Sequence, residues 1–133
     1  MNLAALLVNI LGMHIIIKST NLNLTPAIEK YIEEKIGSLD HFIKKRFEGK
    51  SEIKAEVEIA RTTKHHRHGD VFCAEVNLHL PKKNLRAEHS DWDIRIAIDK
   101  TRDKLQREIK KYKEKRALTR VNRKGRQISE ITE

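Results

Sequence analysis

The stretch "SEIKAEVEIA" at residues 51–60 alternates apolar and charged side chains from Glu52 to Ile59. Successive side chains of a β-strand point to opposite faces, so one face of this strand is apolar and the other is charged. The apolar face carries Ile53, Ala55, Val57 and Ile59. The pattern predicts a half-buried strand of an antiparallel sheet.

The next apolar segment, "VFCAEVNLHLP" at residues 71–81, alternates in the same way. Its predicted inward side chains are Phe72, Ala74, Val76, Leu78 and Leu80. The segment between the two, "RTTKHHRHGD" at residues 61–70, is then a hairpin connection. Two shorter segments, "HIIIKS" at 14–19 and "NLRAEH" at 84–89, complete the predicted set of strands.

Two segments have helical patterns. In the first, Thr25 is the predicted N-cap and Pro26 occupies the first helical position, where its missing N–H costs nothing. Its apolar stripe consists of Ile28, Ile32, Ile36, Leu39 and Ile43. The second helix is predicted to begin at "SDWD", where Ser90 and Asp93 have the spacing of a capping box, and to run to about Lys115.

The order βαβββα predicts an α+β fold, in which both helices pack on the apolar face of a four-stranded sheet, as in double-stranded-RNA-binding folds. We assign residues 13–116 to this domain, 1–12 to an N-terminal extension and 117–133 to a basic, disordered tail. The extension has no positively charged start and no cleavage signature, and its apolar run is too short to cross a bilayer, so no membrane association is expected. The one cysteine, Cys73, cannot form an internal disulfide, which fits a cytoplasmic protein.

The chain is basic, with 28 Lys and Arg residues against 19 Asp and Glu residues and a net charge of +9. Such an excess favours a polyanionic partner if it is concentrated on one surface. Around the axis of the second helix, the apolar and buried positions gather within about 40° of Leu105. These positions are Ile94, Ile98, Thr101, Ile109 and Tyr112.

Five cations of the same helix gather between about 200° and 280° from Leu105. They are Lys100, Lys104, Arg107, Lys111 and Lys115, which we call the basic stripe. No acidic side chain falls in that arc; Asp99, Asp103 and Glu114 lie on one flank and Glu108 on the other. Like charges at these spacings repel one another, so the stripe indicates an external anion, with an ordinary solvated lysine-rich helix as the alternative.

The outward face of the sheet is predicted to be acidic, with few cations between its carboxylates. The acidic residues are Glu52, Glu56, Glu58, Glu75 and Glu88. The same face offers no aromatic platform for stacking bases, which argues against an RRM-like reader of RNA. Contact with RNA through the helix and the 61–70 loop remains open.

The 61–70 loop contains His65, His66 and His68 beside Lys64 and Arg67. A zinc site needs ligands with compatible spacing, but the chain has no CxxC and no HExxH motif, and Cys73 is predicted to face solvent. No motif supplies an activated nucleophile with its base, so we predict no catalytic residue, no metal and no cofactor. The loop fits better as a set of donors to phosphate, with a solvated polar loop as the alternative.

Three co-linear segments carry a family likeness: "HRHGDVFCAEVNL" at 66–78, "NLRAE" at 84–88 and "AIDKTRDKLQREIKKYKEK" at 97–115. With the βαβββα order, they resemble the ribosome hibernation-promoting factors, also called ribosome-associated translation inhibitors or protein Y, over about residues 13–116. The resemblance implies a cytoplasmic, non-enzymatic protein without a small-molecule substrate, which docks on the small ribosomal subunit at the subunit interface. There it would lie across the channel of messenger RNA and transfer RNA.

The resemblance also implies which residues contact ribosomal RNA. Lys104, Arg107 and Lys111 match the family pattern directly, and Lys100 and Lys115 extend it. The residues in the other matching motifs are His66, Arg67, His68 and Arg86.

Two features depart from the family pattern. Arg95 stands where many members have an aromatic residue, and the chain stops at Glu133 without the second domain of longer members. We therefore expect a short form that does not pair ribosomes by itself. A general double-stranded-RNA-binding protein or RNA chaperone, using the same helix, is the alternative function.

Overall fold

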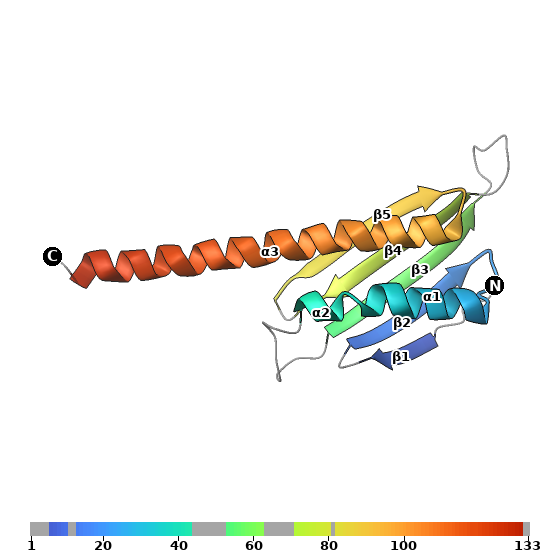
Figure 1. Cartoon of the computed structure of the whole chain (residues 1–133), viewed down its shortest axis with the longest axis horizontal. Helices are drawn as coiled ribbons and strands as arrows, with labels where there is room; N and C mark the ends of the chain where they lie inside the picture. The colour runs from blue at the N-terminus through green and yellow to red at the C-terminus, as the bar shows by residue number, and fades with distance from the viewer. Residues whose placement is uncertain (1–5, 11–12, 44–52, 63–70, 81, 132–133) are drawn as a thin grey trace.

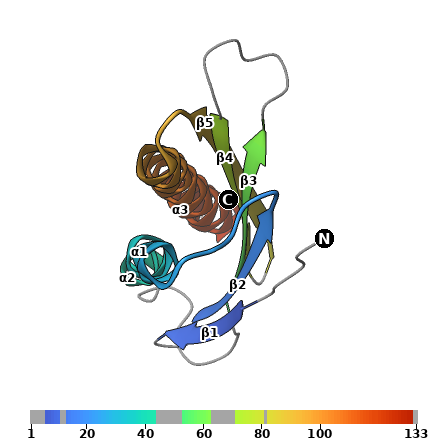
Figure 2. The same cartoon turned by 90° about the vertical axis from the view of Figure 1, so that its right-hand side faces the viewer.

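A computed structural model of the chain describes residues 6–10, 13–43, 53–62, 71–80 and 82–131, with side chains placed from Met13 to Gly125 within these ranges. The elements are β1 (Leu6–Ile10), β2 (Met13–Thr20), α1 (Pro26–Gly37), α2 (Asp40–Ile43), β3 (Ile53–Thr62), β4 (Val71–His79), β5 (Asn84–Asp91) and α3 (Ile94–Ile131). The strands form one sheet in the order β1-β2-β3-β4-β5 (Figure 1). The helices lie together on one side of this sheet (Figure 2), so the predicted α+β arrangement is confirmed.

The sheet is mixed, whereas the alternating pattern of β3 predicted an antiparallel one. β3 pairs antiparallel with β4 but parallel with β2, from Met13 opposite Ile53 to Thr20 opposite Ala60. Parallel neighbours need a crossover connection, and the helices between β2 and β3 supply it. The alternation of β3 therefore predicted its buried face correctly, but only one of its two strand pairings is antiparallel.

The segment assigned to an N-terminal extension contributes a fifth strand. β1 pairs antiparallel with β2, from Leu6 opposite Ile17 to Ile10 opposite Met13. Without β1, the N–H and C=O groups on that side of β2 would form an unpaired sheet edge, which proteins commonly cover. The sheet therefore has the four predicted strands and one more, which the sequence pattern did not indicate.

The predicted core face is buried almost throughout. Ile53, Ala55, Val57 and Ile59 of β3 are at most 5% exposed. In β4, Ala74, Val76 and Leu78 are buried as predicted, but Phe72 is only half-buried. Phe72 pairs with Asp91, the last residue of β5, so it lies at the end of the sheet, before α3 begins to cover it.

The first helix begins as predicted, because the Thr25 hydroxyl accepts a hydrogen bond from the backbone N–H of Ile28 (3.3 Å) and Pro26 follows the cap. The helix is interrupted after Gly37 and resumes as α2. Its apolar stripe faces the sheet across this break, with Ile32, Ile36, Leu39 and Ile43 fully buried.

The start of α3 differs from the predicted capping box. Ser90 lies in β5, paired with Cys73, so it cannot cap the helix. Asp93 is the cap instead: its Oδ1 accepts the backbone N–H of Arg95 (2.8 Å), and its carbonyl accepts that of Ala97 (3.0 Å).

The end of α3 lies beyond the predicted limit near Lys115. The helix continues to Ile131, through the segment that we assigned to a disordered tail, and its C-terminal half projects past the sheet (Figure 1). Residues 116–131 contain no proline and one glycine, Gly125, and more than half of the others are good helix formers such as Arg, Ala, Leu and Lys. A helix surrounded by solvent has no apolar period, which is why the sequence pattern failed to reveal it.

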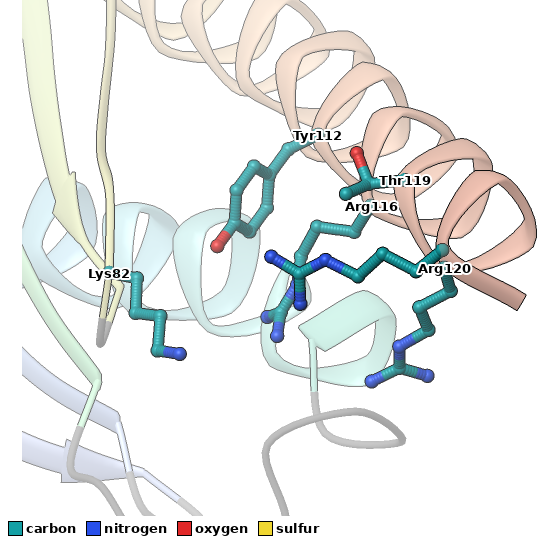
Figure 3. Close-up of a pocket in the computed structure, with 6 residues that line it drawn as sticks. Lys82, Tyr112, Arg116, Thr119 and Arg120 are labelled. Carbon is teal, nitrogen blue, oxygen red and sulfur yellow. The ribbon is translucent and has the colours of Figure 1, made fainter. Parts of the chain in front are cut away.

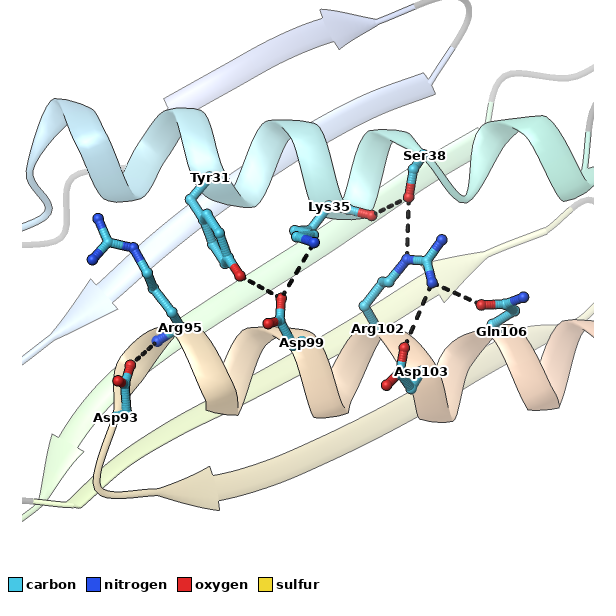
Figure 4. Close-up of polar contacts among 9 residues, drawn as sticks. All are labelled: Tyr31, Lys35, Ser38, Asp93, Arg95, Asp99, Arg102, Asp103 and Gln106. Atoms are coloured by element: carbon cyan, nitrogen blue, oxygen red, sulfur yellow. Dashed lines mark hydrogen bonds and ion pairs between the residues drawn. The ribbon is translucent and has the colours of Figure 1, made fainter.

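Polar contacts between α1 and α3 fix one flank of the long helix (Figure 4). The Tyr31 hydroxyl donates to Asp99 Oδ1 (2.6 Å), and Lys35 Nζ lies 3.8 Å from the same carboxylate. Further along, Arg102 Nε donates to Ser38 Oγ (3.2 Å). Burial and then the hydrogen bond to Asp99 raise the pKa of Tyr31 from 10.0 to about 12.

This pKa gives a testable pH dependence. Because folding raises the pKa of Tyr31, the neutral phenol contributes stability that is present below its ordinary pKa of 10.0 and lost as the pH rises toward about 12. The Tyr31→Phe substitution should lower the free energy of unfolding by about 1 kcal/mol at neutral pH. In this variant, the loss of stability that the titration of Tyr31 causes at alkaline pH should be absent. Urea unfolding across this range measures both effects, and ultraviolet titration in a Tyr112→Phe background measures the pKa itself. A Tyr31 that titrates at 10.0 would contradict the contact.

Candidate nucleic-acid interface

The apolar seam of α3 lies against the sheet as predicted. Ala97, Ile98, Thr101, Leu105 and Ile109 are at most 2% exposed. The Thr101 hydroxyl lies 2.7 Å from the Ala97 carbonyl and 3.1 Å from the Ala74 carbonyl, so its polarity is satisfied inside the core and links α3 to β4. The packing therefore fixes the rotation of α3 about its axis.

The basic stripe consequently faces solvent. Lys100, Lys104, Arg107, Lys111 and Lys115 are all exposed. They occupy successive turns on the side of α3 that faces away from the buried seam. The projection drawn from the sequence is confirmed in its geometry.

A groove runs between the stripe and the edge strand β5. It has a volume of about 300 Å³ and is lined by Arg86, Ala87, Glu88, Lys104, Arg107, Glu108 and Lys111. Lys104 Nζ donates to the backbone carbonyl of Glu88 (2.8 Å), which holds the ammonium group at the rim of the groove. An extended polyanion could lie along this groove and contact successive cations of the stripe.

The carboxylates near the stripe leave it with a positive excess. Lys111 lies 3.5 Å from Glu108, but both side chains are well exposed, and such surface pairs are weak. On the other flank, Asp99 is held by Tyr31 and Lys35 of α1. Asp103 lies 3.5 Å from Arg102, which also contacts α1 (Figure 4). Asp99 is therefore engaged by α1 and Asp103 by Arg102, whereas Glu108 contacts the stripe at Lys111.

Arg86, which the family resemblance assigned to RNA binding, lies among carboxylates. Its Nε is 3.0 Å from Glu75, and its Nη2 is 3.3 Å from Glu88. Arg86 therefore lines the groove but adds little net positive charge to it. Its role in RNA binding stays a prediction.

The outward face of the sheet carries mixed charge rather than a nearly pure acidic surface. Lys54 Nζ is 3.1 Å from Glu56, and the hydrogen bond from Lys54 is the largest cause that lowers the pKa of Glu56. The ring of His79 lies 3.6 Å from the same carboxylate. Glu52 lies outside the described residues. Among the described residues, the positive excess therefore lies mainly on α3.

Most of the 61–70 loop, which we call the histidine loop, falls outside the part of the chain that the structure describes. His66, Arg67 and His68 all belong to residues 63–70, so their predicted contacts with RNA stay predictions. Among the residues that are described, no three His, Cys, Asp or Glu side chains are grouped so that they could hold a metal ion. No described helix is both long and apolar enough to cross a membrane.

Sequence reasoning missed a second group of cations, where α3 leaves the sheet. Arg116, Arg120 and Arg123 gather there with Lys82 from the connection between β4 and β5. Two of these arginines belong to the segment that we assigned to a disordered tail, and Lys82 is distant in sequence. No local sequence pattern could have predicted that these residues lie together.

Comparison with known proteins gives consistent matches. The model of the family described as "Sigma 54 modulation protein / S30EA ribosomal protein" matches residues 15–117. A ribosome hibernation promotion factor of Lactococcus lactis is 39% identical over 112 residues, which cover 83% of this chain and 52% of that protein. The factor of the same name from Staphylococcus aureus is 36% identical over 110 residues, with coverages of 83% and 50%. The chain thus spans about half the length of these curated relatives.

Solved structures share the fold. The crystal structure of the N-terminal domain of Thermus thermophilus Protein Y matches with a TM-score of 0.58 and 30% identity, over 79% of this chain and 99% of that one. A ribosomal subunit interface protein from Coxiella burnetii matches with a TM-score of 0.54, over 73% of this chain and 96% of that one. Its identity of 19% supports the shared fold alone.

The crowding of cations on the stripe predicts a cost in stability. Arg107 has Lys104 three residues before it and Lys111 four residues after it, and like charges at these spacings destabilise a helix. Glutamine has a similar helix propensity to arginine. Arg107→Gln should therefore leave the free energy of unfolding unchanged or raise it by about 0.2–0.5 kcal/mol, as measured by urea unfolding at low salt. A decrease of more than about 1 kcal/mol would mean that Arg107 stabilises the fold.

Proposed function

Because the chain belongs to the family described as Sigma 54 modulation protein / S30EA ribosomal protein, we propose that it is a ribosome hibernation factor that binds the small ribosomal subunit. The proposal covers the matched domain, which includes most of β2, all of β3 to β5 and the whole length of α3 that packs on the sheet. The names of the two curated relatives support this role. We propose a cytoplasmic protein, in line with the location of ribosomes.

The exposed basic stripe is the observation that carries the proposal. Ribosomal RNA presents a dense array of phosphates, which Lys and Arg side chains neutralise with release of counterions. Five cations on one exposed face of a rigid helix match such a surface. The buried seam of α3 prevents the helix from rotating, so the backbone that carries the stripe is already positioned and need not be ordered on binding.

The mechanism that we propose is occupancy without chemistry. Phosphates of the small-subunit RNA bind along the stripe and the β5–α3 groove, with the histidine loop as a second contact. The body of the domain then fills space at the subunit interface that messenger RNA and transfer RNA need. A ribosome held in this state is intact but cannot translate.

Charge reversal tests this interface. The Lys104→Glu/Arg107→Glu/Lys111→Glu triple places acids in the centre of the stripe and should reduce binding to purified small subunits by at least about 100-fold, because repulsion replaces attraction at several phosphates. Co-sedimentation or fluorescence anisotropy measures the affinity. Circular dichroism and the melting temperature should stay close to those of the wild type, because all three side chains are exposed.

A matched control separates local contact from net charge. Lys18→Glu/Lys30→Glu/Lys54→Glu changes the net charge by the same amount at exposed positions on β2, α1 and β3. This control should bind small subunits within a few-fold of the wild type. If both triples lose binding equally, the stripe is no specific interface, and if neither does, the stripe has no part in docking.

A competition experiment distinguishes this function from that of a general double-stranded-RNA binder or RNA chaperone. An RNA duplex of arbitrary sequence, added in excess at moderate salt, should leave most of the protein on small subunits. An unstructured messenger RNA with its transfer RNA should displace it. Ready displacement by the arbitrary duplex would favour the general RNA binder.

A further inference from the structure

A pocket lies in the corner where α3 leaves the sheet (Figure 3). It has a volume of about 290 Å³ and is lined by Lys82, Tyr112, Arg116, Thr119, Arg120 and Arg123, which we call the exit pocket. Lys82 comes from the connection between β4 and β5, and the other residues come from α3. Four of these six residues are cationic and none is acidic.

The arginines of the exit pocket continue the line of the buried seam. Tyr112, Arg116, Thr119 and Arg123 all fall within about 40° of Leu105 in projection, and Arg120 within about 60°. Up to Tyr112 this side of α3 carries apolar residues that pack on the sheet. Beyond Tyr112 the sheet ends, and the same side carries guanidinium groups.

The pocket is also arranged around an aromatic ring. The Arg116 guanidinium lies 5.7 Å from the centre of the Tyr112 ring, and Lys83 Nζ lies 5.9 Å from it. These cation–π contacts anchor two of the charges where the helix leaves the sheet. In Figure 3, Lys82 and Arg116 extend toward the same space beside Tyr112.

The four cations that line the exit pocket are suited to binding a phosphate. Guanidinium groups present a planar fork of donors that matches phosphate oxygens. The pocket is only partly enclosed, so it can accept a phosphate that belongs to a continuous chain.

The exit pocket and the basic stripe lie on different sides of one helix. The stripe is centred at about 240° from Leu105 and the pocket arginines at about 30°, so roughly 150° separates them. A projecting helix with cations on two nearly opposite sides can fit between two backbone segments of RNA. A single strand on the stripe could not reach both.

We propose that the exit pocket binds phosphates of a second RNA backbone segment of the small subunit, so that the projecting part of α3 lies between two segments. This inference rests on the proposed function, because it takes ribosomal RNA as the partner. It adds Lys82, Arg116, Arg120 and Arg123 to the interface. It also assigns a role to the length of helix beyond the sheet.

Neutralisation of the pocket tests the inference in the full chain. Arg116→Gln/Arg120→Gln/Arg123→Gln should lower the slope of log affinity for small subunits against log salt by about 2, that is, by 0.7 to 0.9 for each phosphate that is no longer neutralised. Lys110→Gln/Lys113→Gln/Lys124→Gln removes three cations of the same helix outside both surfaces and should change the slope much less. Lys82→Gln, which cannot disturb the helix, should lower the slope by about one.

Hydroxyl-radical footprinting of small subunits identifies what the pocket contacts. With the wild-type protein, two RNA segments should be protected from cleavage. With the pocket triple, protection of one segment should be lost, while the segment that depends on Lys104, Arg107 and Lys111 should stay protected. A weaker affinity with an unchanged footprint would overturn the inference, because the pocket would then contact a protein. A pocket triple that binds like its control would also overturn it, while leaving the stripe intact. If neither the pocket variants nor the stripe variants lost binding, that result would instead contradict the proposed function.

Discussion

Burial of one apolar seam of α3 against β4 and β5 determines the direction of every other side chain on that helix. Leu105 and Ile109 are almost fully buried, and Thr101 bonds to the backbone of β4 within the core. Rotation of α3 by the 100° of a single residue would bring charged side chains into this core, at a cost that no surface contact could offset. The exposed basic stripe is therefore a consequence of hydrophobic packing, and no partner is needed to orient it.

The polar contacts around α3 involve charged side chains on one flank of the helix and, among the described residues, leave most cations of the basic stripe without a close carboxylate. The acid nearest to α1, Asp99, is held by Tyr31 and Lys35, and Arg102 is shared between Ser38, Gln106 and Asp103. These contacts use the mixed-charge flank of the helix to join it to α1. The cations on the far side are left crowded and exposed, an arrangement that costs some stability and gains affinity for a polyanion.

Local periodicity revealed the parts of the fold that bury a face. The alternation from Ile53 to Ile59 and the seam around Leu105 both mark contact with the core, and the structure confirms both. The start of α3 was misplaced because Ser90 fits a capping pattern equally well but is used by β5. β1 and the solvent-exposed end of α3 have no such signal, because an edge strand and a solvated helix need not bury a regular stripe. The exit pocket forms because the fold brings Lys82 and Arg116 to the same place, which no spacing along the sequence could predict.

Charge is the force that brings the domain to RNA in the proposed function, and the salt dependence of its affinity for purified small subunits measures that force directly. Titrations from about 50 to 300 mM monovalent salt should give a slope of log affinity against log salt of about −3.5 or steeper, as expected if the stripe neutralises about five phosphates at 0.7 to 0.9 each. A slope near zero, with binding retained at high salt, would show that docking relies on other contacts and would contradict the account.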